Sequence, residues 1–251
     1  MGRLDDKVAI VTGAGGGQGA AEAKLLAKEG AKVVVTDVAF ENVQNIAKEI
    51  NEEFPGSAIA LKHDVASEEN WQEVTKKAIE EFGKINVLVN NAGVLATKSY
   101  EEVDQEYFQF AMNINTWGQF VGIKTVAPYM KENGGGSIIN IGSLASVINA
   151  GGFNPYTASK GAVEALSRSA AAEFGPFKIR VNSVHPGSIN TKMLTDTVTT
   201  QEGLDAVAQM IPLRRHGEPV DVAKLVLFLA SDDSEYITAD RFIIDGGMWV
   251  Q

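Results

Sequence analysis

The chain has 251 residues, 45% of them hydrophobic, which suffices for one large α/β domain or two small ones. Its 22 Lys and Arg against 32 Asp and Glu give a net charge of −10, so the sequence offers no electrostatic footprint for nucleic acid or for an anionic membrane surface. It has no cysteine, so we expect neither disulfides nor thiolate metal sites. It does not begin like a signal peptide and has no run of the ~20 apolar residues that a membrane span needs, so we expect a soluble, cytoplasmic protein.

Short apolar runs alternate along the chain with longer segments whose apolar residues recur every three or four positions. The predicted strands are Lys7–Thr12, Lys32–Asp37, Ala58–Lys62, Asn86–Asn90, Ser137–Ile141, Arg180–Val184 and Phe242–Ile244. The predicted helices are Gly17–Glu29, Asn42–Glu53, Ser67–Phe82, Asp104–Lys131, Tyr156–Phe174 and Val220–Ala230. Near-continuous apolar runs such as "VAIV" and "VVV" are typical of a parallel sheet covered on both faces. The alternation predicts βαβ units and a doubly wound α/β fold of about seven strands, with residues 1–251 forming one domain.

Residues 190–212 break this alternation. They carry a polar, Thr-rich run followed by "VAQMIP", without a clear strand. Long inserted segments in compact domains are often lids or binding loops. We therefore expect a mobile segment that covers a substrate.

Five glycines lie between the first predicted strand and the first predicted helix, in "VTGAGGGQG". Small residues there let the backbone approach a pyrophosphate at the positive N-terminus of the helix, as in a Rossmann-type fold. Asp37 ends the next strand, 37 − 19 = 18 residues past Gly19, close to the offset of a carboxylate that accepts hydrogen bonds from ribose hydroxyls. The same carboxylate would repel a 2′-phosphate, and the neighbouring Gly15, Gly16 and Val38 supply no cation. The predicted cofactor is NAD.

The stretch "PYTASKGAVEAL" places Tyr156 and Lys160 one turn apart on the same face of a predicted helix. A nearby cation favours the phenolate and lowers the pKa of a tyrosine. A tyrosine acting as a base near neutral pH needs its pKa of ~10 lowered by about three units, which requires roughly 4 kcal/mol. An exposed ion pair supplies ~1 kcal/mol or less, so the pair could be catalytic only in a water-poor cleft. Taken alone, such a pair is more often merely packed or solvated.

The ordered set of motifs resembles the short-chain dehydrogenase/reductase family over nearly the whole chain. The motifs are T-G-x-x-x-G-x-G at Thr12–Gly19, "NNAG" at Asn90–Gly93, a helical asparagine at Asn115, a serine at Ser143, Y-x-x-x-K at Tyr156–Lys160, "HPGSINT" at His185–Thr191 and "DGG" at Asp245–Gly247. One residue departs from the pattern. Gln18 stands where the family usually has Ile or Leu, and its side chain would either contact the cofactor or point into solvent.

The resemblance implies the residues that bind the cofactor. Asp64 and Val65 would hold the adenine, while Ile189 and Thr191 would hold the nicotinamide carboxamide. The complete implied set is Gly13, Gly17, Gln18, Gly19, Asp37, Asp64, Val65, Asn91, Ala92, Gly93, Tyr156, Lys160, Pro186, Gly187, Ile189 and Thr191.

The resemblance also implies the catalytic residues Asn115, Ser143, Tyr156 and Lys160. Tyr156 would exchange the proton of an alcohol, and Lys160 would favour its phenolate and bind the nicotinamide ribose. The Ser143 hydroxyl can position the substrate oxygen. We do not expect Ser143 to act as a nucleophile, because it does not lie in a G-x-S-x-G motif. Asn115 would hold a water that relays protons to Lys160.

Histidines give no sign of a metal site. In "HPG", His185 is interpreted as structural, and His63 and His216 lie far apart without the spacing of ligands. We expect no catalytic metal.

These inferences predict an NAD-dependent oxidoreductase that interconverts a secondary alcohol and a ketone. The alternatives are a 3-oxoacyl-thioester reductase, against which Asp37 and the acidic charge weigh, and a non-catalytic NAD-binding module. The segments expected to line the substrate pocket suit a neutral, cyclic or medium-sized alcohol, and they carry Leu95, Leu144, Val147, Ile148, Phe153, Met193, Leu194 and Met210. The resemblance further implies a homotetramer built through the two long predicted helices and the apolar ending "GGMWV".

Overall fold

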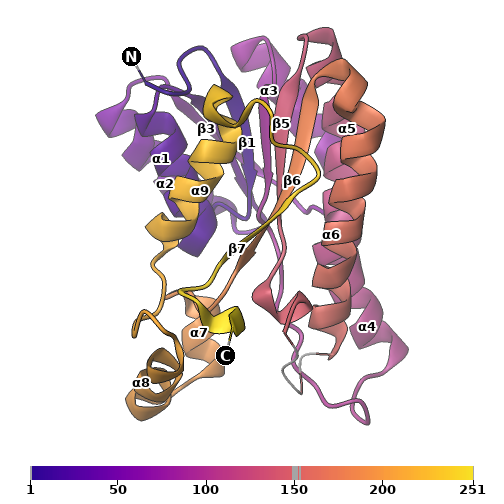
Figure 1. The fold of residues 1–251 in the computed structure, drawn as a ribbon. Coiled ribbons are helices and arrows are strands. Elements are labelled where there is room, and N and C mark those ends of the chain that lie inside the picture. The colour runs from indigo at the N-terminus through magenta and orange to yellow at the C-terminus, as the bar shows by residue number, and fades with distance from the viewer. Residues whose placement is uncertain (1, 149–151, 153, 251) are drawn as a thin grey trace.

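The chain folds around one parallel sheet (Figure 1). In the computed structural model, which describes residues 2–148, 152 and 154–250, the strands are β1 (Val8–Thr12), β2 (Lys32–Asp37), β3 (Ala58–Lys62), β4 (Val87–Asn90), β5 (Gly136–Ile141), β6 (Ile179–Pro186) and β7 (Arg241–Ile244). Their order is β3-β2-β1-β4-β5-β6-β7, and every adjacent pair is parallel. The predicted seven-stranded, doubly wound sheet is confirmed. The strand order reverses between β1 and β4, which is where such sheets bind ligands.

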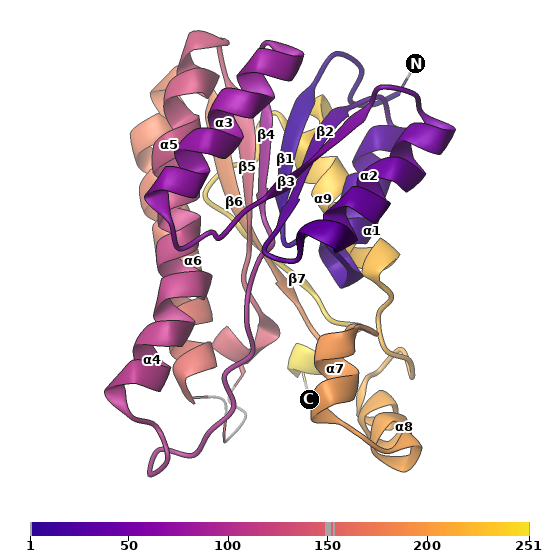
Figure 2. The ribbon, with the colours of Figure 1, turned by 180° about the vertical axis from the view of Figure 1, so that it is seen from behind.

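Helices cover both faces of the sheet, as the two opposite views show (Figures 1 and 2). One face carries α1 (Gly17–Lys28), α2 (Phe40–Glu53) and α9 (Pro219–Ala230), and the other carries α3 (Glu68–Phe82), α5 (Gly118–Glu132) and α6 (Asn154–Phe174). Local capping fixes the ends of α3: the Ser67 hydroxyl accepts from the Asn70 amide, and Gly83 ends the helix with a φ of 77°. Helices α1 and α9 pack directly against each other.

The strands are buried on both faces because their side chains alternate between two cores. In β1, Ala9 and Val11 join the core under α1, α2 and α9. Ile10 and its cross-strand neighbours Val34 and Leu88 join the core under α3, α5 and α6. All five residues of β1 are buried, which explains why the strand is a continuous apolar run rather than an alternating one.

The predicted helical stretch Asp104–Lys131 is helical from Gln105 onward, but it is not one regular α-helix. Helix α4 (Gln105–Met112) is followed by a π-helical turn, Asn113–Trp117, before α5 begins. Apolar residues keep recurring every three or four positions through this turn, so the periodicity does not reveal it. The fully buried Asn115 lies within the turn, and π-turns of this kind are frequent at functional sites.

The irregular segment 190–212 contains two short helices, α7 (Lys192–Thr197) and α8 (Gln201–Met210). Neither has a buried residue, and both lie beyond the carboxyl ends of the strands (Figure 1). Just before them, Ile189 pairs with Gly217 in an isolated bridge. The movement of this segment stays a prediction.

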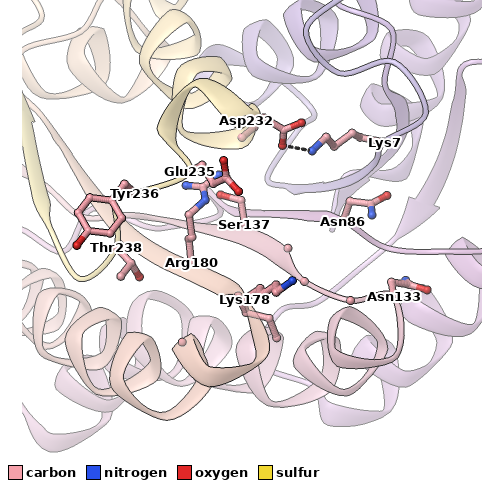
Figure 3. A pocket seen from close by; sticks show the side chains of 16 residues that line it. Lys7, Asn86, Asn133, Ser137, Lys178, Arg180, Asp232, Glu235, Tyr236 and Thr238 are labelled. Atoms are coloured by element: carbon pink, nitrogen blue, oxygen red, sulfur yellow. Dashed lines mark hydrogen bonds and ion pairs between the residues drawn. The ribbon is translucent and has the colours of Figure 1, made fainter.

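At the other end of the sheet, where the strands begin, lies a polar hollow of about 680 Å³ (Figure 3). Lys7 pairs there with Asp232. The Arg180 guanidinium donates to the carbonyl oxygens of Leu229 (2.8 Å) and Ser231 (3.1 Å). These contacts tie the start of the chain and β6 to the segment after α9, so the lining cations Lys7 and Arg180 serve the fold.

None of the helices within the described ranges is both long enough and apolar enough to cross a membrane.

Candidate active site

The carboxyl ends of the strands open into a cleft of about 810 Å³. Every residue predicted to bind the cofactor lines this cleft except Gly19. The structure therefore gathers residues from the glycine-rich loop, from the ends of β2, β3, β4 and β6, and from α6.

Gly13 and Gly19 of the glycine-rich loop leave no room for a side chain. Gly13 has a φ of 64°, and a Cβ there would lie 2.8 Å from the Ala92 Cα. A Cβ on Gly19 would lie 2.4 Å from the Gly13 carbonyl oxygen, so Gly19 allows the helix to pack against the loop instead of lining the cleft. The Asn91 side chain braces the same loop by donating to the carbonyl oxygens of Thr12 (2.9 Å) and Gly13 (3.2 Å).

The N-terminus of α1 is suited to an anion. Gly16 occupies its N-cap position, no side chain caps the helix, and no acidic residue lies in its first turn. A Cβ on Gly16 would meet nothing within 4 Å, so the backbone is open to close approach. Uncapped amides with the positive end of the helix dipole fit a dinucleotide diphosphate.

Asp37 lies at the end of the cleft formed by β2. Its Oδ2 accepts from the Gly15 amide (3.1 Å) and its Oδ1 accepts from the Ala39 amide (2.9 Å). Each carboxylate oxygen keeps a further lone pair for a ribose hydroxyl. Among the described residues that line the cleft, Lys160 and Lys192 are the only lysines or arginines, and Lys192 pairs with Asp196 (2.7 Å).

Three of the predicted catalytic residues converge near Gly93. Lys160 on α6 is 3% exposed, and its Nζ donates to the Ile141 carbonyl oxygen (2.8 Å) and lies 6.0 Å from the Tyr156 ring centroid. A Cβ on Gly93 would come within 3.1 Å of both the Asn115 Oδ1 and the Lys160 Nζ. A larger residue at this position would therefore have to displace the Asn115 or Lys160 side chain.

Ser143 follows β5 and faces Tyr156 closely enough for a side-chain hydrogen bond. Burial raises the pKa of the Tyr156 hydroxyl, and the hydrogen bond with Ser143 offsets this only in part. Burial also lowers the pKa of Lys160 to about 8. The structure thus differs from the expectation that Lys160 lowers the pKa of Tyr156: in the protein by itself, desolvation dominates both groups.

Asn115 fixes two elements to each other. Its Nδ2 donates to the Val94 carbonyl oxygen (2.9 Å) and to the Ser159 hydroxyl (3.0 Å), and its Oδ1 accepts from the Val94 amide (2.8 Å). The side chain therefore joins the turn after β4 to α6, and it does not line the cleft. Its predicted relay role stays a prediction.

His185 has the structural contacts expected from "HPG". Its buried ring lies between the Ser143 carbonyl oxygen (3.1 Å from Nδ1) and the Ser183 hydroxyl (3.0 Å from Nε2). Burial lowers its pKa, so the ring is neutral at neutral pH. A Cβ on Gly142 would lie 2.6 Å from this ring, which shows how tightly the ring packs behind Ser143.

Two buried groups at the cofactor side were missed by the sequence analysis. His63 lines the cleft, contacts Trp71 edge-to-face with ring centroids 4.4 Å apart, and has its pKa lowered to about 4 by burial. Glu22 on α1 is fully buried. For Glu22, the only available signal was an acidic residue at a position of α1 where the neighbouring turns place Ala20, Ala23 and Leu26 in the core.

The substrate end of the cleft is mostly apolar. Of the residues predicted there, Leu95, Leu144, Ile148, Met193 and Leu194 line the cleft. Val147 and Met210 do not: Val147 ends the short helix Leu144–Ser146, and Met210 is 55% exposed at the end of α8. Phe153 lies outside the described residues.

Comparison with known proteins agrees with this geometry. A family model described as enoyl-(acyl carrier protein) reductase matches residues 13–249. The chain is 40% identical over 250 residues to a trans-4-hydroxycyclohexanecarboxylate dehydrogenase of Sinomonas cyclohexanicum, covering 98% of this chain and 93% of the relative. It is 41% identical over 246 residues to a 3-alpha-(or 20-beta)-hydroxysteroid dehydrogenase of Mycobacterium tuberculosis, covering 98% and 90%.

Among solved structures, levodione reductase superposes with a TM-score of 0.95 at 32% identity, covering 98% of this chain and 99% of that one. The match is therefore to whole relatives of the same fold and not to an isolated nucleotide-binding half. The chain belongs to the short-chain dehydrogenase/reductase family and is an oxidoreductase that interconverts a secondary alcohol and a ketone.

Proposed function

We propose that the protein is an NAD-dependent dehydrogenase of a neutral, cyclic or medium-sized apolar secondary alcohol. The observation that carries the proposal is the polarity of the two ends of the cleft. Asp37 lies at one end, where the cleft lining has no lysine or arginine beside it, because its cross-strand neighbour Lys62 lies outside the lining; apolar side chains line the other end.

Four side chains of the protein have separate roles in the reaction. The Tyr156 phenolate accepts the hydroxyl proton of the alcohol, while the Ser143 hydroxyl donates to the same oxygen and holds it beside the phenol. Lys160 binds the nicotinamide ribose and places a positive charge behind Tyr156, and Asn115 holds a water that relays protons to Lys160. When bound, the nicotinamide ring takes up the hydride, and its positive charge favours the phenolate.

The cofactor choice follows from Asp37. Its carboxylate accepts from both adenosine ribose hydroxyls of NAD, and such charge-assisted bonds contribute about 1.5–3 kcal/mol each. The 2′-phosphate of NADP would lose one bond and place like charges side by side. The residues nearest to Asp37 in the cleft wall, Gly15, Val38 and Asn42, are uncharged, so nothing there offsets the repulsion.

The apolar wall supports a neutral substrate, and the relatives, which are named for a cyclohexanecarboxylate alcohol and a steroid alcohol, support a cyclic one. We include the segment 190–212 in the site because Met193 and Leu194 of α7 and Val207 of α8 line the cleft. Closure of this segment over the substrate would exclude water from the reacting oxygen. In this proposal, the rest of the chain and the segment 190–212 together form one catalytic domain.

The experiment is a cofactor-reduction assay with purified protein, NAD or NADP, and a panel of alcohols that includes cyclohexanol, cyclopentanol, a hydroxysteroid and a sugar phosphate. We expect reduction of NAD by the apolar cyclic alcohols. Faster oxidation of NADPH with a 3-oxoacyl thioester would favour the thioester reductase instead. Cofactor binding without turnover of any substrate, in either direction, would favour a non-catalytic binding module.

A further inference from the structure

Helix α1 contains three buried oxygens without a hydrogen-bond donor in the described structure. They are Oε1 of Gln18 and both carboxyl oxygens of Glu22. Buried acceptors without a partner are rare in folded proteins, and each costs on the order of its desolvation. Three of them within one turn of a single helix call for one common explanation.

Gln18 and Glu22 are four residues apart, so their side chains lie on the same face of α1. A helical side chain leans toward the N-terminus, which brings the Glu22 carboxyl back over the turn that holds Gln18. Gln18 lines the cofactor cleft at the uncapped end of the helix, whereas Glu22 lies one turn deeper and is fully buried.

With the Gln18 carboxamide oxygen turned inward, an ionised Glu22 would leave all three oxygens without a donor, because a carboxylate and a carboxamide oxygen are both acceptors. A protonated Glu22 pairs two of the three, since its O–H is a donor and the Gln18 oxygen is an acceptor one turn away; the second carboxyl oxygen of Glu22 is left as a neutral acceptor, which costs less than a buried charge. Burial favours this form and raises the pKa of Glu22 to about 8. No charged group contributes to that pKa; Lys24 on the same helix pairs with Glu49, and Asp221 on the packed helix α9 pairs with Arg215.

We infer that Glu22 is protonated in the folded protein and donates its O–H to the Gln18 carboxamide oxygen, which directs the Gln18 N–H groups toward the cofactor diphosphate. Glu22 is thus a positioning residue, and Gln18 is a side-chain ligand of the cofactor. The inference rests on the proposed function in that a dinucleotide occupies the cleft. The contact with Glu22 explains why a polar residue can stand at position 18: its buried carboxamide oxygen needs a hydrogen-bond donor, which an apolar side chain would not need.

The first test concerns the proton and needs no cofactor. Infrared spectra of the wild-type protein near pH 7 should contain a protonated-carboxyl band that disappears in Glu22→Gln. In Gln18→Leu the band should remain but shift, because the acceptor of the O–H is lost. Gln18 is only partly buried, so this variant leaves the core intact. The inference would be overturned if the wild type lacked the band, or if the frequency of the band were the same in Gln18→Leu as in the wild type.

The second test measures the affinity for NAD by titration calorimetry. Glu22→Gln should stay within about twofold of the wild type, because its amide can also donate to Gln18. Glu22→Leu and Gln18→Leu should each bind NAD about tenfold more weakly, as expected for one lost hydrogen bond to a charged group. The double variant should bind no more weakly than either single variant, and Glu53→Gln on the exposed face of α2 serves as the control.

Two outcomes separate this inference from the proposed function. A wild-type protein that binds neither NAD nor NADP would defeat the proposed function. A wild-type protein that binds its cofactor, with Glu22→Leu and Gln18→Leu at unchanged affinity or with additive losses in the double variant, would defeat only the contact proposed here. Thermal unfolding of each variant separates a loss of binding from a loss of folding.

Discussion

At the scale of single residues, burial shifts the pKa values of Tyr156 and Lys160, the two groups of the Y-x-x-x-K motif, in opposite directions. Desolvation favours the neutral form of each, so Tyr156 holds its proton more tightly and Lys160 holds its proton less tightly than in water. The motif therefore supplies the groups, while the charge that makes Tyr156 a base has to come from the complete site. Sequence reasoning named the pair and expected the charge of Lys160 to act in a water-poor cleft, but it did not anticipate that burial of the two groups would oppose this effect.

Replacing Tyr156 with Phe removes only the hydroxyl that exchanges the proton. We expect kcat to fall by ~10²–10⁴-fold, the usual contribution of a general acid–base group, with the affinity for NAD nearly unchanged. Steady-state kinetics and calorimetry measure the two quantities. The matched control is Tyr236→Phe, because Tyr236 is fully exposed at the far end of the molecule. A variant that kept more than about a tenth of kcat would exclude Tyr156 as the base.

Asp37 decides the cofactor in our proposal. We expect kcat/KM to favour NAD over NADP by more than ~100-fold, since each 1.4 kcal/mol of discrimination is tenfold. Asp37→Ser combined with Val38→Arg should narrow or reverse the ratio, because the repulsion is removed and a phosphate ligand is added. Val38→Arg alone, with Asp37 in place, is the control. Equal use of both cofactors by the wild type would show that Asp37 does not face the ribose.

At the scale of elements, the strands and most helices were predictable because burial on two faces leaves an unambiguous pattern in the sequence. The break between α4 and α5 was not, because the side chain that occupies it, Asn115, is bonded to Val94 and Ser159 far away in the chain. Helices α7 and α8 were also missed: α7 has only six residues, and the apolar positions of α8, Leu204, Val207 and Ala208, recur at helical spacing over only ten residues. Motifs predicted residues that the fold gathers around one cleft, whereas Glu22 and His63 depend on burial that only the fold reveals.

The free energy of unfolding of the protein should depend on pH through Glu22 of helix α1. Between about pH 4.5 and pH 8 the unfolded chain loses this proton while the folded protein keeps it, so the free energy of unfolding falls as the pH rises. The fall amounts to about 5 kcal/mol at most, because each pH unit of the interval is worth about 1.4 kcal/mol. Glu22→Gln does not titrate, so its stability relative to the wild type should grow by an amount of this order from pH 5 to pH 8.

Urea unfolding of both proteins at several pH values measures this difference, and the comparison cancels the titration of all other groups, His63 included. Glu53→Gln, an exposed substitution, should show no such trend. A constant difference between Glu22→Gln and the wild type would mean that the pKa of Glu22 is the same in the folded and unfolded protein.

At the scale of the whole molecule, α4, α5 and the turn between them expose several aromatic side chains. Trp117 and Phe120 stack with ring centroids 5.5 Å apart, and Phe108 and Phe110 of α4 are 41% and 48% exposed. We propose that these exposed aromatic side chains, together with the apolar ending "GGMWV", form the contacts of a homotetramer.

Light scattering at micromolar concentration should therefore give a mass near four times 26.8 kDa. The pair of substitutions Trp117→Glu and Phe120→Glu should reduce this mass, because it buries charge in the contact. Gln72→Glu on the exposed face of α3 should leave the mass unchanged. A wild-type protein that scatters as a monomer would rule out the assembly.

The packing of α1 against α9 joins the first helix of the chain to a helix near its end. Helix α1 ends at Lys28 and α9 begins at Pro219, which is 219 − 28 = 191 positions later. At the usual 5–20 residues per second, a ribosome needs about 10–40 s to cover that distance. Throughout this interval the apolar face of α1 has no α9 to pack against. The apolar face of α1 can therefore take part in aggregation until α9 has been synthesised.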